Sequence, residues 1–332
     1  MSSTKWKDGL LSSSLPLEFE VAKLLVKLGF GVDADFSYGR YDSNILKDFS
    51  IDIHAEYYPA YSAIFDLLIE CKYRTPNKKW LFLPDPNKDY FTNYGLSDPV
   101  RYVDDFAIRY FGKRYSVQTP TGEPLPITYK GTEINLTDGS VYDADIRHGI
   151  AQLRYGLPRL LTERIVENFA LMEEGNPFIF CPILVTTAEI YVMNPATSLK
   201  KVLKASKIDQ LAKPVPYVVL HADYGPDFEM HCRSREFQEL NQLTKQIEGE
   251  EKWKSFEDRR ARIKGRRRIA HDLPSHLLRN LVALERTYMN RYFTQFFVAR
   301  FSELPLLISD LKRSVNQTAR TLRKIPTVRR IS

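Results

Sequence analysis

From Phe65 to Arg74 the chain reads FDLLIECKYR, an apolar run that ends with an acid and a lysine two positions apart. This run is typical of an interior strand. Because a strand points alternate side chains to the same face, Glu70 and Lys72 share one face, while Ile69 and Cys71 point into the opposite layer. The sequence therefore predicts a carboxylate and an ammonium group close together at the end of a buried strand. A plain salt bridge would have the same pattern.

A second strand, Phe49–His54, precedes this one, and its apolar and polar residues alternate. Asp52 therefore lies on its polar face. The connection between the two strands is short enough for an antiparallel pair, which would bring Asp52 beside Glu70. Hard divalent cations prefer oxygen ligands, and Mg²⁺ is commonly held by one or two carboxylates. Two carboxylates and Lys72 together predict a site that cleaves phosphodiester bonds.

At these residues the chain resembles the PD-(D/E)xK nuclease superfamily, and most closely the Mrr-like restriction endonucleases. Asp52 stands where the family has its metal-binding aspartate, and Glu70-Cys71-Lys72 where it has the (D/E)-x-K triplet. The family's other motifs follow in the same order along the chain: Leu17-Glu18, Val21-Ala22-Lys23-Leu24-Leu25, Gly29-Phe30, Gln152 and Leu184-Val185-Thr186-Thr187. The departures are a long insertion after the triplet and the lack of a proline just before Asp52.

The resemblance implies an α/β fold: a restriction-endonuclease-like mixed sheet flanked by helices. It implies an endonuclease that needs Mg²⁺ or Mn²⁺ and acts on DNA, in prokaryotic restriction or anti-phage defence. A nuclease of DNA repair or recombination is the alternative within the same class. In this reading Asp52, Glu70 and the Cys71 carbonyl hold the metal, and Lys72 orients or deprotonates the attacking water. The other two site residues it implies are Glu18, which supports the site or a second ion, and Gln152.

The first helix offers two acids, and helical geometry separates them. Residues three, four and seven positions after Glu18 are apolar, whereas those after Glu20 include Lys23 and Lys27. We therefore expect Glu18 to face the sheet and Glu20 to pair with a lysine in water.

Length and composition predict two domains, because 332 residues with 43% hydrophobic content can bury a sizeable core. We expect a disordered lead-in over residues 1–14 and a nuclease-like domain over 15–225. Within that domain, residues 75–143 form an insertion of loops and short strands that contacts substrate or partner, or is inert decoration. Residues 226–332 are expected to form a helical, basic C-terminal region.

The helical expectation for this region rests on a stripe of Leu, Tyr and Phe residues from Leu281 to Phe297, which reads as core or as a dimer contact. The insertion and the C-terminal helices are the candidate surfaces for a protein partner or for a second copy of the chain. No apolar run has the length of a membrane span, and Met1–Leu11 lacks the order of a signal peptide, so we expect a cytoplasmic protein without membrane contact. Cys71, Cys181 and Cys232 are expected to be buried thiols.

The net charge of +7 and the pI of about 9.1 are compatible with a polyanionic partner. The excess is concentrated in one stretch, where these residues are predicted to contact phosphates: Arg259, Arg260, Arg262, Lys264, Arg266, Arg267 and Arg268. The alternative is a solvated surface.

Two other classes of function stay open. One is a catalytically silent module that keeps the nuclease fold and binds nucleic acid or a partner. The other is a structural protein in which Glu70 and Lys72 form an ordinary salt bridge, a reading that leaves Asp52 and Glu18 without an explanation. A cleavage assay that depends on divalent metal separates the nuclease from both.

Overall fold

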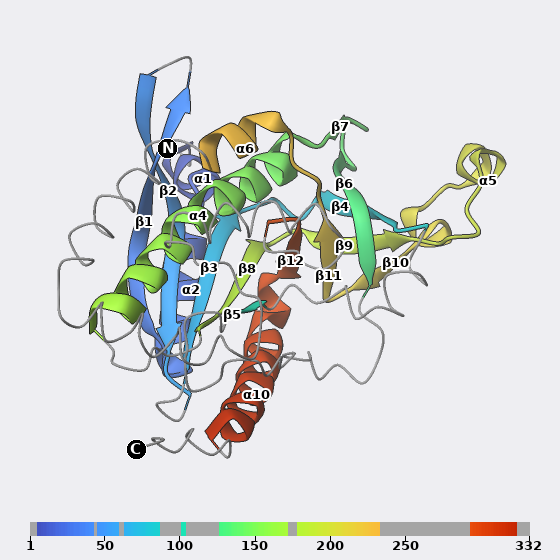
Figure 1. Ribbon diagram of the computed structural model, residues 1–332. Coiled ribbons are helices and arrows are strands. Elements are labelled where there is room, and N and C mark those ends of the chain that lie inside the picture. The colour runs from blue at the N-terminus through green and yellow to red at the C-terminus, as the bar shows by residue number, and fades with distance from the viewer. Residues whose placement is uncertain are drawn as a thin grey trace, which may run out of the picture.

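The computed structural model describes residues 5–42, 45–59, 63–86, 101–103, 126–171, 178–232 and 293–323. These residues form one mixed sheet with helices on both faces (Figure 1). The strand order is β1-β2-β3-β8-β12-β11-β6-β4-β9-β10, with β5 also beside β8 and β7 beside β6. The expectation of an α/β fold built on a mixed sheet flanked by helices is confirmed at this level.

The strands that carry the candidate site are long, and the others complete the sheet. Their bounds are β1 Gly31–Asp42, β2 Ile45–Tyr57, β3 Ile64–Lys72, β4 Lys78–Pro84, β5 Arg101–Val103, β6 Ile127–Asn135, β7 Val141–Tyr142, β8 Phe178–Thr186, β9 Glu189–Met193, β10 Ala212–Val215, β11 Tyr217–His221 and β12 Gln295–Arg300. The α-helices are α1 Lys5–Ser12, α2 Leu15–Lys27, α4 Ala144–Leu171, α5 Leu199–Lys204, α6 Pro226–Cys232 and α10 Leu304–Arg323. Short 3-10 turns are η2 Ile208–Gln210 and η3 Phe301–Glu303. Among the described residues, no helix has both the length and the hydropathy needed to cross a membrane.

Helix α2 and strands β1, β2 and β3 follow one another as the sequence predicted. Gly29, with φ +83°, ends α2 in the left-handed conformation that glycine adopts without steric cost. Strands β1, β2 and β3 pair antiparallel, and β8 then adds to β3 in parallel. The turn expected over residues 39–44 is shorter than predicted, because pairing continues to Asp42 opposite Ile45.

Two apolar layers cover the sheet. On one face α4 and α6 pack over β2, β3 and β8, and on the other α2 and α10 pack over the same strands. Two glycines of α4, seven residues apart, lie against the sheet: a Cβ at Gly149 would come within 2.6 Å of Leu184, and one at Gly156 within 2.3 Å of Ile51. Because these positions lack a Cβ, α4 approaches the strands closely.

The lead-in expected to be disordered is helical over Lys5–Ser12. The serines that suggested disorder complete the end of this helix instead. The Ser12 and Ser13 hydroxyls donate to the Gly9 and Leu10 carbonyls at 2.8 and 2.7 Å, which satisfies two acceptors at the C-terminus of α1.

The expected domain boundary at residue 225 is wrong, because β12 lies inside the sheet between β8 and β11. These residues were predicted to be helical. Phe296 packs in the layer with α4 and Phe297 in the layer with α2, so the run is an interior strand that is buried on both faces. A short, continuous apolar run has no period that would separate such a strand from a buried helix.

The described part of the insertion is also sheet. Strand β6 pairs with β4 and β11, and β4 pairs with β9, so these strands extend the same sheet and do not form a separate decoration. The rest of the insertion and residues 233–292 of the C-terminal region lie outside the described residues, and with them lie the predicted phosphate-binding arginines. The three cysteines are buried and free, as expected.

We predict that Gly156→Ala destabilises the protein, because the added methyl group would overlap Ile51 at the interface between α4 and the sheet. The expected cost is about 1–3 kcal/mol in the free energy of unfolding, measured by denaturant titration. Gly9→Ala is the control, because Gly9 lies in helix α1 with open space around its Cα, and it is expected to be neutral or mildly stabilising. Equal effects of the two substitutions would contradict this packing.

Candidate functional site

The acid and the lysine at the end of β3 are in contact. Lys72 Nζ donates to Glu70 Oε1 at 2.6 Å, and Glu70 is fully buried whereas Lys72 keeps 18% of its side chain exposed. Asp52 lies beside them: the antiparallel register pairs Ile53 with Ile69, and Asp52 Oδ2 accepts a hydrogen bond from the Cys71 amide at 2.6 Å. The proximity predicted for Asp52, Glu70 and Lys72 is confirmed.

Helix α4 supplies the predicted glutamine. Gln152 Oε1 accepts from Lys72 Nζ at 3.3 Å, and its amide nitrogen donates to the Ser50 carbonyl at 3.3 Å. Gln152 therefore contacts the lysine ammonium in addition to Glu70 and links it to β2. The close approach of α4 at Gly149, where a Cβ would lie 3.5 Å from Glu70 Cγ, makes this contact geometrically accessible.

The two acids of α2 separate as helical geometry predicted. Glu20 pairs with Lys23 at 3.3 Å, and both side chains are 57% exposed. Glu18 is partly buried and close enough to Asp52 and Lys72 for their charges to act on it. The residues that turn this face of α2 toward the sheet are the buried Leu17, Val21 and Leu25.

A fourth carboxylate, that of Asp35, was not among the site residues predicted from the sequence. In the register of β1 and β2 it stands opposite Asp52, between the pairs Ala34–Ile53 and Phe36–Ile51, and its φ is +58°. The side-chain alternation breaks at this point: Ile53 packs in the layer with α2, and Ile51, two residues earlier, in the layer with α4. A left-handed residue that is not glycine is uncommon outside special sites, and aspartate is one of the few that tolerates it. Sequence patterns carry no signal for such a backbone angle.

Crowding of like charges dominates the electrostatics. Burial and the charge of Asp52 raise the pKa of Glu70 to about 7. Burial, Asp52 and Asp35 raise the pKa of Glu18 to about 7 as well. Burial also raises the pKa of Asp52, with Asp35 adding to it, although the Cys71 amide and Lys72 act in the opposite direction. One ammonium group therefore faces more carboxylates than it can neutralise.

The residues fit a hard divalent cation. Glu70 Oε2 is buried and has no hydrogen-bond partner among the described residues, which is costly for a carboxylate oxygen unless a cation binds it. Asp52, in the neighbouring strand β2, adds a second carboxylate beside the end of β3. Two carboxylates with backbone oxygen and water are the ligands that Mg²⁺ and Mn²⁺ prefer. The metal-binding role of the Cys71 carbonyl stays a prediction, and the Cys71 thiol, whose pKa burial raises, points to the opposite layer.

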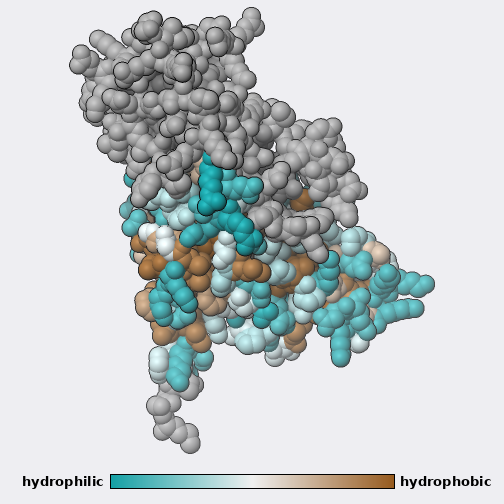
Figure 2. Space-filling view, turned by 90° about the horizontal axis from the view of Figure 1, so that it is seen from below, coloured by the Kyte–Doolittle hydropathy of each residue, from teal (hydrophilic) through white to brown (hydrophobic). Residues whose placement is uncertain are grey.

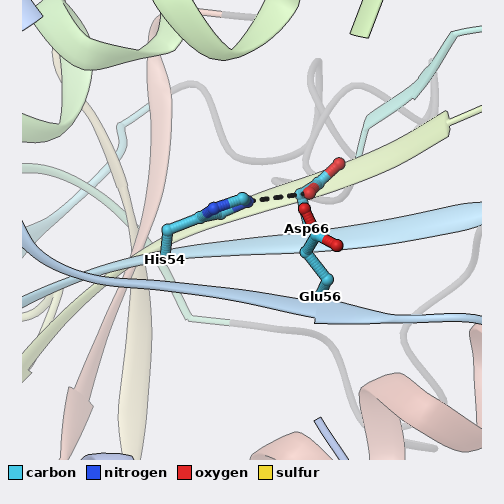
Figure 3. A group of neighbouring side chains, drawn as sticks. All are labelled: His54, Glu56 and Asp66. Carbon is cyan, nitrogen blue, oxygen red and sulfur yellow. Dashed lines mark hydrogen bonds and ion pairs between the residues drawn. The ribbon is translucent and has the colours of Figure 1, made fainter. Parts of the chain in front are cut away.

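A second polar cluster lies farther along β2 and β3, where His54, Glu56 and Asp66 point toward one another (Figure 3). Their ligand atoms lie within 4.8 Å of one another, and among the described residues no other three His, Cys, Asp or Glu side chains are so close.

This cluster is already neutralised by Arg164 of α4. The Arg164 guanidinium bonds both Asp66 oxygens, at 2.5 and 3.0 Å, and also Glu56. His54 bonds Asp66 at 2.9 Å and Tyr58 donates to Glu56 at 2.5 Å, so each carboxylate oxygen has a partner. We therefore interpret the cluster as a structural network that anchors α4 and not as a metal site.

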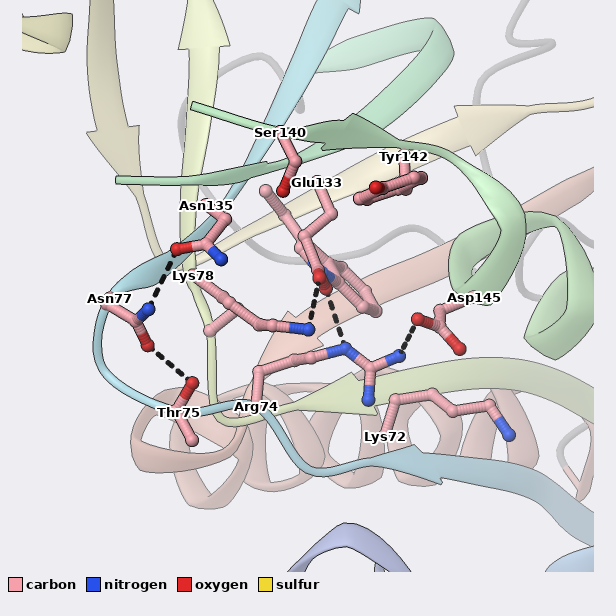
Figure 4. Close-up of polar contacts among 12 residues, drawn as sticks. Lys72, Arg74, Thr75, Asn77, Lys78, Glu133, Asn135, Ser140, Tyr142 and Asp145 are labelled. Carbon is pink, nitrogen blue, oxygen red and sulfur yellow. Dashed lines mark hydrogen bonds and ion pairs between the residues drawn. The ribbon is translucent and has the colours of Figure 1, made fainter. Parts of the chain in front are cut away.

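The chain beyond β3 is held by a second set of contacts. Thr186 and Thr187, the predicted Thr-Thr end of β8, bond the backbone of Lys72 and of Arg74. Arg74 bonds Glu133 of β6 at 2.6 Å and Asp145 of α4 at 2.5 Å, and its charge is thereby balanced. Figure 4 shows the Lys72 side chain extending away from this cluster. Its ammonium group bonds Glu70 and Gln152 instead.

Comparisons with known proteins add no assignment: the chain matches no protein-family model, no curated protein and no solved structure. The candidate site therefore rests on the residues and their geometry.

We predict that Glu18→Gln stabilises the metal-free protein at pH 8 and does so much less at pH 5. The folded-state pKa of Glu18, about 7, lies above its ordinary value of 4.5, so the folded state favours the protonated form. The protein therefore loses stability as the pH rises from about 4.5 through 7, and glutamine removes this loss. Thermal unfolding in chelator at both pH values measures it.

Glu20→Gln is the matched control, because it removes a carboxyl group of the same helix from an exposed pair. Its effect is expected to stay below about 0.5 kcal/mol and to be the same at both pH values. A Glu18→Gln variant that is less stable than the wild type at pH 8 would contradict the crowding of charges described above.

Proposed function

We propose that the protein is a metal-dependent nuclease of the PD-(D/E)xK type that hydrolyses phosphodiester bonds in nucleic acid, with DNA as the expected substrate. The observation that carries the proposal is the buried Glu70 Oε2 beside Asp52 and Lys72, which has no hydrogen-bond partner among the described residues. A purely structural salt bridge would satisfy both oxygens of the acid, as the Arg164 network does for Asp66.

The arrangement supports a division of roles among the chain's own residues. Asp52 and Glu70 would hold Mg²⁺ or Mn²⁺, together with the Cys71 carbonyl. When bound there, the cation would lower the pKa of a bound water and offset the charge that develops on the phosphate. Lys72, held between Glu70 and Gln152, is positioned to orient the attacking water or to take up its proton. Glu18 and Asp35 add negative charge beside Asp52.

The order of elements also supports the proposal. A helix, three antiparallel strands, a helix and a parallel strand follow one another as α2, β1, β2, β3, α4 and β8. The site lies at the carboxyl ends of the parallel strands β3 and β8, the place where open α/β sheets commonly bind ligands. A restriction-endonuclease-like core with a role in restriction or anti-phage defence, inside the cell, is the reading that accommodates these features.

A catalytically silent module that binds nucleic acid is the second candidate. Such a module would keep the fold without needing a buried carboxylate oxygen that lacks a hydrogen-bond partner, so the lack of a partner for Glu70 Oε2 among the described residues favours the nuclease.

We predict that Asp52→Asn and Lys72→Ala each lower the rate of DNA cleavage more than a hundredfold, the size expected for loss of a metal ligand or a proton-transfer group. Asparagine retains an oxygen that can accept from the Cys71 amide, so the Asp52→Asn variant should keep its fold. The assay incubates purified protein with plasmid, linear and single-stranded DNA and with RNA, in Mg²⁺, in Mn²⁺ or in chelator. Calorimetric titration with Mn²⁺ measures metal binding independently of cleavage.

Full cleavage by either variant in Mg²⁺ would reject this site. Metal binding by the wild type without cleavage of any substrate would favour the silent module.

We further predict that Glu18→Gln lowers the cleavage rate strongly, whereas Glu20→Gln leaves it within twofold of the wild type. Only Glu18 is close enough to Asp52 and Lys72 to act on the reaction, since Glu20 pairs with Lys23 in water. Rates are compared at saturating Mg²⁺, and a larger defect in Glu20→Gln would reverse the assignment.

A further inference from the structure

A projecting segment between β9 and β10 is the strongest candidate for a second contact with substrate. Residues 194–211 contain α5 and η2, and we call them the basic finger. Strands β9 and β10 pair antiparallel at its base, with Met193 opposite Ala212. In Figure 1 the finger stands out from the edge of the sheet opposite to the β1–β2 hairpin. The helix predicted for residues 199–211 is thus two short pieces on a protrusion.

Helix α5 has no buried residue. Leu199 and Leu203 are 85% and 87% exposed, the highest values among the exposed large hydrophobic residues. A helix of six residues gains too little from its own hydrogen bonds to be explained by local propensity, and this one gains nothing from a packed face. A fixed but unpacked element of this kind is typical of a surface that meets a partner.

The charge of the finger is strongly positive. It carries Lys200, Lys201, Lys204 and Lys207 against the single acid Asp209. Within the described part of the chain, Lys200 and Lys204 form no ion pair with a carboxylate, whereas Lys79, at the other end of β9, pairs with Glu189 at 2.8 Å. Figure 2 shows hydrophilic colouring prevailing at the end of the molecule where Figure 1 places α5.

The lysines surround a hollow. It has a volume of about 430 Å³, and its lining includes Ser198, Lys200, Lys201, Lys204, Gln210 and Leu211. The Lys201 ammonium donates to the Ala196 carbonyl at 2.9 Å, which holds it at the rim with donors to spare. The hollow is open and most of its lining is apolar, so a phosphate group would be held at its rim by the lysine ammonium groups.

We propose that the basic finger binds the phosphate backbone of nucleic acid, at a place separate from the cleavage site. This rests on the proposed function, which supplies a polyanionic substrate. Thr186, which pairs with Lys72, and Met193 at the base of the finger are seven residues apart in sequence, a span of at most about 25 Å. At 3.4 Å per base pair, this span corresponds to at most about seven base pairs of duplex. The finger would therefore contact substrate within about one helical turn of the bond that is cut.

An anionic membrane also presents phosphate groups that the lysines could bind. The free energy available from burying the two leucines argues against membrane binding. Burying two leucine side chains contributes about 3–6 kcal/mol. A single myristoyl chain, which buries more apolar surface than two leucines, gives only marginal membrane binding. Two leucines bury too little apolar surface to anchor the protein to a membrane, whereas they are large enough to contact sugars and base edges of nucleic acid.

The test measures binding of a fluorescent 30-base-pair duplex by anisotropy at several salt concentrations, using full-length protein that carries Asp52→Asn to prevent cleavage. Replacing Lys200, Lys201 and Lys204 with glutamine is expected to weaken binding about tenfold or more at 100 mM salt. The slope of log affinity against log salt should fall by about 2 to 3, because each lost phosphate contact removes about 0.9. The control replaces Lys7, Lys27 and Lys130, which are exposed elsewhere, and should leave the slope nearly unchanged.

The outcomes separate this inference from the proposed function. If the finger variant binds the duplex as tightly as the control and with the same slope, the finger is not a nucleic-acid contact, even where the wild type cleaves DNA. If the finger variant loses binding but Asp52→Asn cleaves like the wild type, the finger is a nucleic-acid contact and the proposed cleavage site is wrong. Binding of the parent protein to phosphatidylserine vesicles, lost in the finger variant, without binding to duplex would overturn the inference in favour of a membrane. Equal melting temperatures of the variants exclude misfolding.

Discussion

Repulsion between buried carboxylates is the interaction on which the candidate site depends. Asp52 and Glu70 come together because of the register of two antiparallel strands, and Glu18 because of the face that α2 turns to the sheet. In a low-dielectric interior this arrangement costs free energy, and one lysine offsets only part of the cost. Folding therefore has to supply the stability elsewhere, through the two apolar layers that enclose the strands.

The interface between α4 and the sheet contains two polar clusters with opposite character. Toward the C-terminus of α4, Arg164 leaves no oxygen of Asp66 without a bond, while near the N-terminal part of the helix one oxygen of Glu70 has none among the described residues. The satisfied cluster is rigid because each member restrains the others. It fixes the rotation and the axial position of α4, and the two glycines fix its distance from the strands. The Arg164 network and the two glycines, which lie outside the candidate site, thus position Gln152 beside Lys72.

The sequence predicted what depends on local period and short connections. The side-chain alternation of β3 and the brief loop between β2 and β3 were enough to predict that Asp52 lies beside Glu70, and the helical period was enough to separate Glu18 from Glu20. It failed where tertiary context decides. The alternation predicted for β2 does not hold at Asp52, because Ile51 and Ile53 pack in opposite layers. The Gln295–Arg300 run has no period that identifies it as a strand, and the turn- and proline-rich composition of residues 75–143 concealed β4 and β6. Arg164 was one more charge on a helix, Asp35 required knowledge of a backbone angle, and the lysines of the finger lay in a segment that read as an ordinary helix.

The position of β12 has a consequence for how the protein acquires its structure. This strand, close to the C-terminal end of the chain, pairs with β8, which in turn supports β3. Contacts between segments more than a hundred residues apart in sequence raise the contact order and slow folding. Until the ribosome has released residues 295–300, the C-terminal half of β8 is an open edge that invites pairing with another chain. A nascent chain therefore carries Asp52, Glu70 and Lys72 long before the complete sheet can hold them in place.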